Sequence, residues 1–222
     1  MRCFWGIVAV VVGHCCGGGG CCRDRTPYIT TLRNGSASTI PAWNNISGNF
    51  FLANYNPSLA IDNDDGSSYW QHHGNFIVYG QAGLKFDFGA HDMRAIGNYY
   101  AYIDVAYNGG GPNAGIASSD GWFVNNTVVV GGGSFSYFGN GYASNCFLVG
   151  KPELQSEIYG NAVHSAGVLH VACLNASAPA KGCTLSCPLG EWLTQGYDRG
   201  TTIGPLPRDE EIIAAGKLLL GM

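Results

Sequence analysis

A short phrase recurs along this chain of 222 residues, and it constrains the fold more than any other feature. The phrase places an asparagine directly before a run of β-branched or aromatic residues, and Gly-rich turns separate the runs. Recurrence at spacings of 26, 23, 28 and 35 residues is typical of a solenoid, in which each repeat stacks on the previous one. The repeated asparagines are Asn49, Asn75, Asn98, Asn126 and Asn161.

The residues between these asparagines favour strands over helices. A helical periodicity of 3.6 residues is absent, whereas 34 glycines and 12% aromatic residues suit short strands joined by tight turns. We therefore predict an all-β fold, a short parallel β-helix of about four coils. Asparagines of successive coils would stack at one corner and hydrogen-bond as a ladder. An antiparallel sandwich with asparagine turns is the alternative.

The C-terminal residues have a different pattern. "CPLGEWLTQG" and "PRDEEIIAAGKLLLGM" each predict a helix, with Pro207 in the first turn of the second. Asp209, Glu210 and Glu211 would lie near its positively polarised N-terminal end. Because a solenoid needs cover at its open end, we predict that residues 187–222 form a helical cap on a β-helix domain of residues 23–186.

The N-terminal residues 1–22, "MRCFWGIVAVVVGHCCGGGGCC", resemble a secretory leader, because Arg2 precedes an apolar run. That run is too short for a comfortable membrane span. A mis-started or truncated chain with non-native first residues is the alternative. Sequons of the N-x-S/T type agree with a secreted or cell-surface location, and they begin at Asn34, Asn45, Asn125 and Asn175.

Four of the nine cysteines lie late in the chain, at Cys146, Cys173, Cys183 and Cys187. An even set behind a leader predicts two disulfides, whose pairing the sequence leaves open. A zinc site is the alternative, although Cys183 and Cys187 lack a second close pair. The net charge of −4 and the absence of a basic stripe make nucleic acid and anionic membranes poor partners.

Three carboxylates crowd the segment "AIDNDDGSSYW" at residues 60–70: Asp62, Asp64 and Asp65. Strand alternation would turn Leu59 and Ile61 inward and Asp62 and Asp64 outward. In "GLKFDFG" the same alternation turns Lys85 and Asp87 outward. Both segments are offset by the local repeat of 23 residues, so Lys85 should stack beside Asp62, and Asp87 beside Asp64.

Carboxylates one coil apart would be separated by roughly 5 Å, the separation found in retaining glycosidases. Crowding would push their pKa values apart, leaving one acid protonated and one ionised. Nearby residues could complete a sugar-binding groove. The imidazoles would come from His72, His73 and His91, and the flat rings from Tyr69, Trp70, Tyr99, Tyr100 and Tyr102. Simpler interpretations are a turn at Asp65, an ion pair between Asp62 and Lys85, surface histidines and core aromatics.

The segments "AIDNDDGSSYW" and "NFIVYGQAGLKFDFGAHD" resemble right-handed parallel β-helix proteins of the pectin-lyase-like superfamily, over roughly residues 43 to 130. Most relatives with this pattern are uncharacterised "right-handed β-helix region" proteins, and better understood ones are β-helical glycoside hydrolases such as β-xylosidases. The resemblance implies a right-handed coil and a retaining mechanism, whose Asp would fall on Asp64 or Asp65. The family's Glu would fall at or beside Phe88, whereas the acid of this chain is Asp87, one place earlier.

We expect a secreted carbohydrate-active protein. It would be a retaining glycoside hydrolase that acts on a polysaccharide or oligosaccharide and needs no cofactor. Asp64 would be the nucleophile and Asp87 the acid/base. One alternative is a non-catalytic glycan-binding or cell-surface structural solenoid. Another is a Ca²⁺-dependent polysaccharide lyase or epimerase, with the metal on Asp62, Asp64 and Asp65. Supporting residues would be Asp62, Asp65, Lys85 and His91, and sugar contacts would come from Tyr69, Trp70, His72 and His73.

Overall fold

The structure is a computed structural model. It describes residues 11–12, 42–54, 61–63, 67–86, 91–109, 121–130, 141–144, 156–174, 184–194, 196 and 198–222. Most of its elements are strands in two sheets with parallel pairing, and helices are few, which confirms the all-β prediction. Only β14 and β15 pair antiparallel among the described strands, so the antiparallel sandwich is not the observed arrangement.

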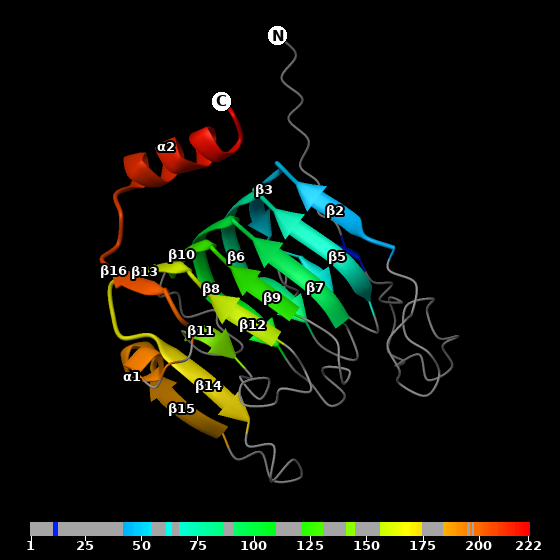
Figure 1. Cartoon of the computed structure of the whole chain (residues 1–222). Coiled ribbons are helices and arrows are strands. Elements are labelled where there is room, and N and C mark those ends of the chain that lie inside the picture. Colours follow the sequence, from blue (N-terminus) through cyan, green and yellow to red (C-terminus); the bar gives the residue numbers. More distant parts are fainter. Residues whose placement is uncertain are drawn as a thin grey trace, which may run out of the picture.

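The first sheet, here called the narrow sheet, has the strand order β12-β9-β7-β5-β2 (Figure 1). Adjacent strands of this sheet come from successive repeats of the sequence. Between two such strands, the chain passes through the other sheet. The strands are β2 (Asn44–Ser47), β5 (Ser68–His73), β7 (His91–Ile96), β9 (Gly121–Val124) and β12 (Ser156–Tyr159).

The second, wide sheet receives the chain from the narrow sheet after each corner. It contains β3 (Phe50–Asn54), β6 (Phe76–Phe86), β8 (Tyr99–Gly109), β10 (Thr127–Val130), β13 (Ala162–Ser165) and β16 (Thr202–Gly204). The second half of β8 continues the sheet into β11 (Gly141–Ser144), β14 (His170–Leu174) and β15 (Thr184–Pro188). A separate pair joins β1 (Val11–Val12) to β4 (Asp62–Asn63).

Every passage from the narrow to the wide sheet uses a corner of two residues. The first corner residue has a positive φ, as at Gly48 (64°) and Gly74 (61°), which glycine adopts without a steric penalty. The second is one of the repeated asparagines. The described residues contain such passages from β2 to β3, β5 to β6, β7 to β8, β9 to β10 and β12 to β13.

The predicted asparagine ladder is confirmed. The backbone N–H of Asn75 donates to Oδ1 of Asn98 at 3.0 Å, and the Nδ2 of Asn75 donates to the same oxygen at 2.9 Å. That Nδ2 also donates to the carbonyl of Ile46 at 2.8 Å. The pattern repeats from Asn49 to Asn161, so each buried amide is satisfied by the neighbouring repeats of the ladder.

The ladder ends on a residue that lies outside the repeated asparagine phrase. The backbone N–H of Asn161 donates to Oγ1 of Thr201 at 2.8 Å, and the Thr201 hydroxyl donates to the carboxylate of Asp198. Gly200, which precedes Thr201, has a φ of 77° like the corner glycines. The following strand β16 pairs with β13. Residues 198–204 therefore cover the end of the ladder.

The inward faces of the two sheets form one core. Residues three positions before each corner asparagine meet across the narrow sheet, and residues two positions after it meet across the wide sheet. The rings of Tyr100 and Phe123, both fully buried, stack with centroids 5.8 Å apart. The two inward rows are Ile46, His72, Ala95, Phe123 and Ile158, and Phe51, Ile77, Tyr100, Val128 and Val163.

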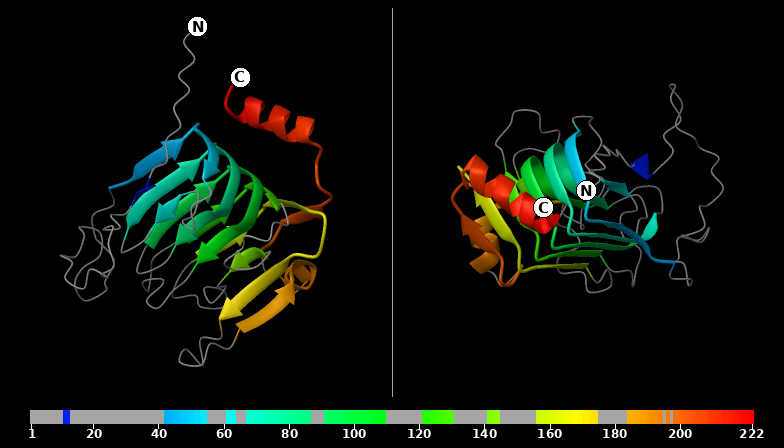
Figure 2. Two further views of the ribbon diagram at one scale, coloured as in Figure 1. Left: turned by 180° about the vertical axis from the view of Figure 1, so that it is seen from behind. Right: turned by 90° about the horizontal axis from the view of Figure 1, so that it is seen from above.

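Helices α1 (Leu189–Thr194) and α2 (Asp209–Leu219) lie where the sequence predicts helices. The predicted position of α2 is wrong, however, because it covers the outer face of the wide sheet rather than an open end (Figure 2). Its Ile212 packs on Phe76, Val78, Ala101 and Val129, which are apolar residues on the outside of the strands. Those residues need cover from water, and the apolar stripe of α2 supplies it.

The disulfide prediction falls largely outside the described residues. Cys146 and Cys183 are not among them. The backbones of Cys173 and Cys187 lie in the antiparallel strands β14 and β15, opposite Leu185 and Val171 respectively. The two disulfides stay a prediction.

Candidate functional site

The acids predicted to be catalytic, Asp64 and Asp87, lie outside the described residues, as does Asp65. The backbone beside them carries the predicted register, because Ile61 bridges Leu84 in parallel. Both side chains are 1% exposed and belong to the core, as the predicted alternation requires. Asp62 in β4 and Lys85 in β6 each follow this bridge by one residue. The roles given to these acids stay a prediction.

The four predicted sugar-contacting residues of β5 are divided between its two faces. Trp70 packs against the core and His72 is fully buried within it. Tyr69 is 8% exposed, and its ring meets that of Trp43 edge-on at 5.5 Å. His73 is half-buried. Successive side chains of a strand point to opposite faces, so these four do not line one groove.

Burial changes the chemistry of His72. Desolvation lowers the pKa of its imidazole from the ordinary value of 6.5 to about 3. Neither ring nitrogen has a hydrogen-bond partner among the described residues. The ring is therefore neutral at physiological pH and inaccessible to a substrate. His91 forms part of β7, where its backbone pairs with Ser68.

The outer face of the narrow sheet carries a cluster that the sequence did not reveal. We call Trp43, Arg94 and Trp122 the tryptophan–arginine cluster. The guanidinium carbon of Arg94 lies 4.1 Å from the ring centroid of Trp43 and 4.7 Å from that of Trp122. All three residues are partly exposed. Cation–π attraction to two indoles holds the guanidinium in place on the sheet surface.

Polar side chains extend this cluster across the sheet. Gln71 lies opposite Arg94 in the strand register, and Asn45 lies opposite Gln71. Asn45 is exposed and Gln71 partly so. Together the face offers flat indole rings, a fixed guanidinium and two amides, which can stack on an apolar ring face and hydrogen-bond to its substituents.

Two residues beside this surface have a left-handed backbone, as Tyr79 and Tyr102 do on the wide sheet. Tyr69 has a φ of 57° and Asp92 a φ of 52°, and the two lie beside each other in β5 and β7. Non-glycine residues in the left-handed region cost about 1–2 kcal/mol each. The Tyr69 ring contacts that of Trp43 and so helps to position this indole of the cluster.

The cluster has a signal in the sequence, which is its distance from the corners. Arg94 and Trp122 each stand four residues before a ladder asparagine, as do Asn45 and Gln71. Because the corners are in register, residues at equal distance before them meet across strands. The repeated phrase consists of the asparagine and the apolar run that follows it. The cluster residues precede the asparagine, so the phrase does not include them.

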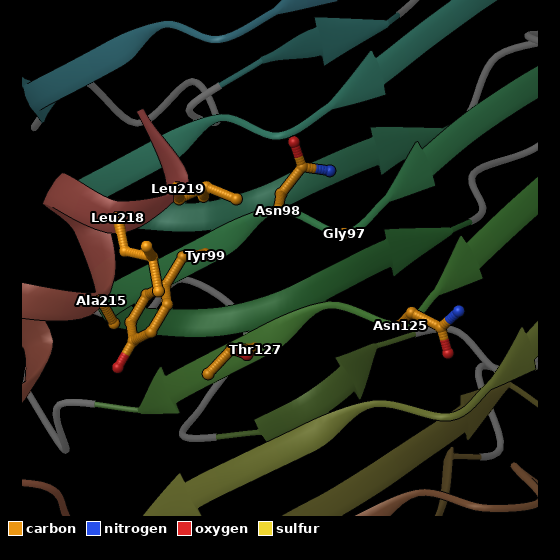
Figure 3. A pocket seen from close by; sticks show the side chains of 8 residues that line it. All are labelled: Gly97, Asn98, Tyr99, Asn125, Thr127, Ala215, Leu218 and Leu219. Atoms are coloured by element: carbon orange, nitrogen blue, oxygen red, sulfur yellow. The ribbon is translucent and has the colours of Figure 1, made fainter. Parts of the chain in front are cut away.

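A hollow lies between α2 and the corner, with a volume of about 410 Å³ (Figure 3). Leu218 is 82% exposed at its rim. Burial and the nearby Glu211 raise the pKa of Tyr99, whose ring forms one wall. No acid or histidine lines this hollow, so it offers little for catalysis. The lining residues are Gly97, Asn98, Tyr99, Asn125, Thr127, Ala215, Leu218 and Leu219.

Within the described residues, no three His, Cys, Asp or Glu side chains are grouped so that they could hold a metal ion. The Ca²⁺ alternative rests on Asp62, Asp64 and Asp65, whose side chains the structure does not describe. The same part of the chain has no helix of the length and apolarity that a membrane crossing requires.

Comparison with protein-family models, with curated proteins and with solved structures found no match to this chain.

Proposed function

We propose that this protein is a short right-handed parallel β-helix, secreted or at the cell surface, that binds glycans on the outer face of its narrow sheet. The observation that carries the glycan-binding proposal is Arg94 held between Trp43 and Trp122 on a partly exposed strand surface. The resemblance to the pectin-lyase-like superfamily supports the same coil and a carbohydrate ligand.

Several features support the coil. The chain passes repeatedly from one sheet to the other and returns to the neighbouring parallel strand. The asparagine ladder joins each such turn to the next. Right-handed crossovers are strongly favoured between parallel strands, because the twist of the strands lets the chain pack back only that way.

The chemistry of the face suits a sugar ring. Pyranose rings present apolar C–H faces, which pack on indoles, and hydroxyls, which accept from guanidinium and amide donors. Cation–π contacts restrain Arg94 before any ligand arrives, which lowers the entropy lost on binding. The indoles lie on strands and their immediate flank rather than on long loops, so their spacing is fixed by the sheet.

The test is affinity electrophoresis of the full chain in gels that contain neutral xylan or polygalacturonate. We expect retardation in at least one gel, and Trp122→Ala should abolish it. Tyr79→Ala is the matched control, because Tyr79 is an aromatic residue that is 42% exposed on the wide sheet. Equal loss in both variants, or no retardation of the wild type, would contradict the proposal.

A second candidate is a retaining glycoside hydrolase with Asp64 as nucleophile and Asp87 as acid/base. The parallel bridge between Ile61 and Leu84 favours it, because that register would place the two acids in neighbouring coils. Asp64→Asn should then abolish hydrolysis of an aryl glycoside without weakening binding in the gels. An aryl glycoside that the wild-type chain leaves intact would count against this candidate.

A further inference from the structure

The corner that carries the ladder has one irregular position. Each ladder residue is preceded by a residue with positive φ, and these φ values are 64°, 61°, 63°, 53°, 68° and 77° along the chain. Glycine adopts such angles freely, whereas a side chain there meets the backbone. Only Asn125 among these residues bears a side chain, and the others are Gly48, Gly74, Gly97, Gly160 and Gly200.

The side chain of Asn125 is exposed and serves no ladder contact. Its backbone N–H donates to the carbonyl of Tyr159 at 3.1 Å, and its amide makes no hydrogen bond within the described residues. A Cβ atom on Gly160 would overlap the Asn125 amide, so the glycine below leaves room for it. Figure 3 shows the amide directed away from α2 and from Leu218.

Asn125 also begins the sequon Asn125-Asn126-Thr127. Its middle residue is a buried ladder asparagine, whose amide is fully engaged with Asn161 and Ala95. The sequon therefore presents one amide to solvent and keeps the other inside. Asn34 and Asn175 lie outside the described residues. The remaining sequon, at Asn45, lies in β2 on the row that contains Gln71 and Arg94.

We propose that Asn125 is an acceptor for N-linked glycosylation. Nδ2 of Asn125 forms a bond to the anomeric carbon of an oligosaccharide carried on a polyprenyl diphosphate. The bond from that carbon to the diphosphate oxygen breaks, polyprenyl diphosphate leaves, and Nδ2 loses one proton. The ladder is untouched, because its hydrogen bonds use Asn126 and not Asn125. This inference rests on the secreted or cell-surface location proposed above.

The position distinguishes Asn125 from Asn45. A glycan on Asn45 would stand on the outer face of the narrow sheet, beside the row that leads to Arg94. A glycan on Asn125 would project from the corner between the sheets and leave that face open. Only the Asn125 glycan is compatible with unchanged binding at the tryptophan–arginine cluster.

The experiment is translation of the full chain in the presence of endoplasmic-reticulum microsomes, followed by peptide mass spectrometry. Protection from added protease reports translocation independently of glycosylation. We expect a protected chain whose glycan maps to Asn125, seen as conversion to Asp by peptide-N-glycosidase. Thr127→Ala should remove it while keeping the Asn125 side chain, and Thr127→Ser should retain it. Asn45→Gln should leave it unchanged.

The failures are distinguishable. A protected chain with unmodified Asn125 would overturn the acceptor proposal and leave the secreted location standing. A chain that the protease degrades completely would overturn both. A glycan at Asn125 that survives Thr127→Ala would overturn the proposal that this sequon makes Asn125 the acceptor. Asn125→Gln, tested in parallel, must also lack the glycan.

Discussion

The outer faces of the two sheets differ although the same corners separate them. On the wide sheet the outward residues are mostly apolar, and α2 covers them with Ile212 and Gly216. On the narrow sheet the outward residues include Arg94 and two indoles, which stay partly exposed. An apolar outer face is closed by the chain itself, whereas the mixed aromatic and polar face stays partly exposed among the described residues.

The largest expected effect comes from the core between the two sheets, and it is a dependence of the free energy of unfolding on pH. The pKa of buried His72 is lowered from 6.5 to about 3, so the folded chain binds fewer protons than the unfolded chain between these values. The free energy of unfolding is therefore highest above pH 6.5 and decreases as the pH falls toward 3. With about 1.4 kcal/mol per pKa unit, the loss is on the order of a few kcal/mol.

Urea unfolding at a series of pH values measures this dependence. His72→Leu should flatten it, because the replacement cannot be protonated and leaves no unpaired ring nitrogen in the core. The neighbouring His73→Leu is the matched control, since His73 lies on the other face and is half-buried. An unchanged pH dependence in His72→Leu would show that other groups are responsible.

The next largest effect is expected from substitutions in the asparagine ladder, at the corner between the two sheets. Asn98→Ala leaves groups of the neighbouring strands and corner unpaired, including the amide of Asn75 and the carbonyl of His72, which costs about 3 kcal/mol. Asn49→Ala should cost less, because Asn49 stands at the outer end of the described ladder and is only half-buried. Tryptophan fluorescence and far-ultraviolet circular dichroism should show one coincident unfolding transition. Equal losses in both variants would mean that depth in the ladder does not matter.

Loosening α2 from the wide sheet tests whether the two outer faces act independently. Any side chain at Gly216 would overlap the ring of Phe76, so Gly216→Leu should cost about 1–3 kcal/mol and increase hydrogen exchange in α2. Ala214→Leu, at an exposed position of the same helix, should have little effect. Retardation in glycan gels should be unchanged in both variants. Lost retardation in Gly216→Leu alone would mean that the wide-sheet face contributes to binding.

The smallest effect concerns the cluster itself. A double-mutant cycle with Arg94→Ala and Trp122→Ala should give a coupling of about 0.5–1 kcal/mol in the free energy of unfolding. Arg94 paired with Tyr79→Ala is the control cycle, and its coupling should be near zero. A coupling as small in the first cycle as in the control would remove the energetic basis for calling the three residues a cluster.

Much of the fold followed from one local rule. Each corner consists of a residue with positive φ followed by an asparagine that hydrogen-bonds to the asparagines of the adjacent corners. This pair forms the same corner whatever loop precedes it, so spacings from 23 to 35 residues are tolerated. The last corner does not match the repeated phrase because it uses Thr201. A terminal residue needs only to accept from Asn161, and a hydroxyl does this as well as an amide.

The sequence by itself therefore determined the corners, the strands that leave them and the two helices, because each depends on backbone preferences within a few residues. Tertiary structure alone decided where α2 lies, that His72 and Trp70 are turned inward, and that Trp43, Arg94 and Trp122 meet. The physical reason is register. Contacts between neighbouring strands depend on which residues stand at equal distances from the corner, and only the assembled sheets bring such residues together.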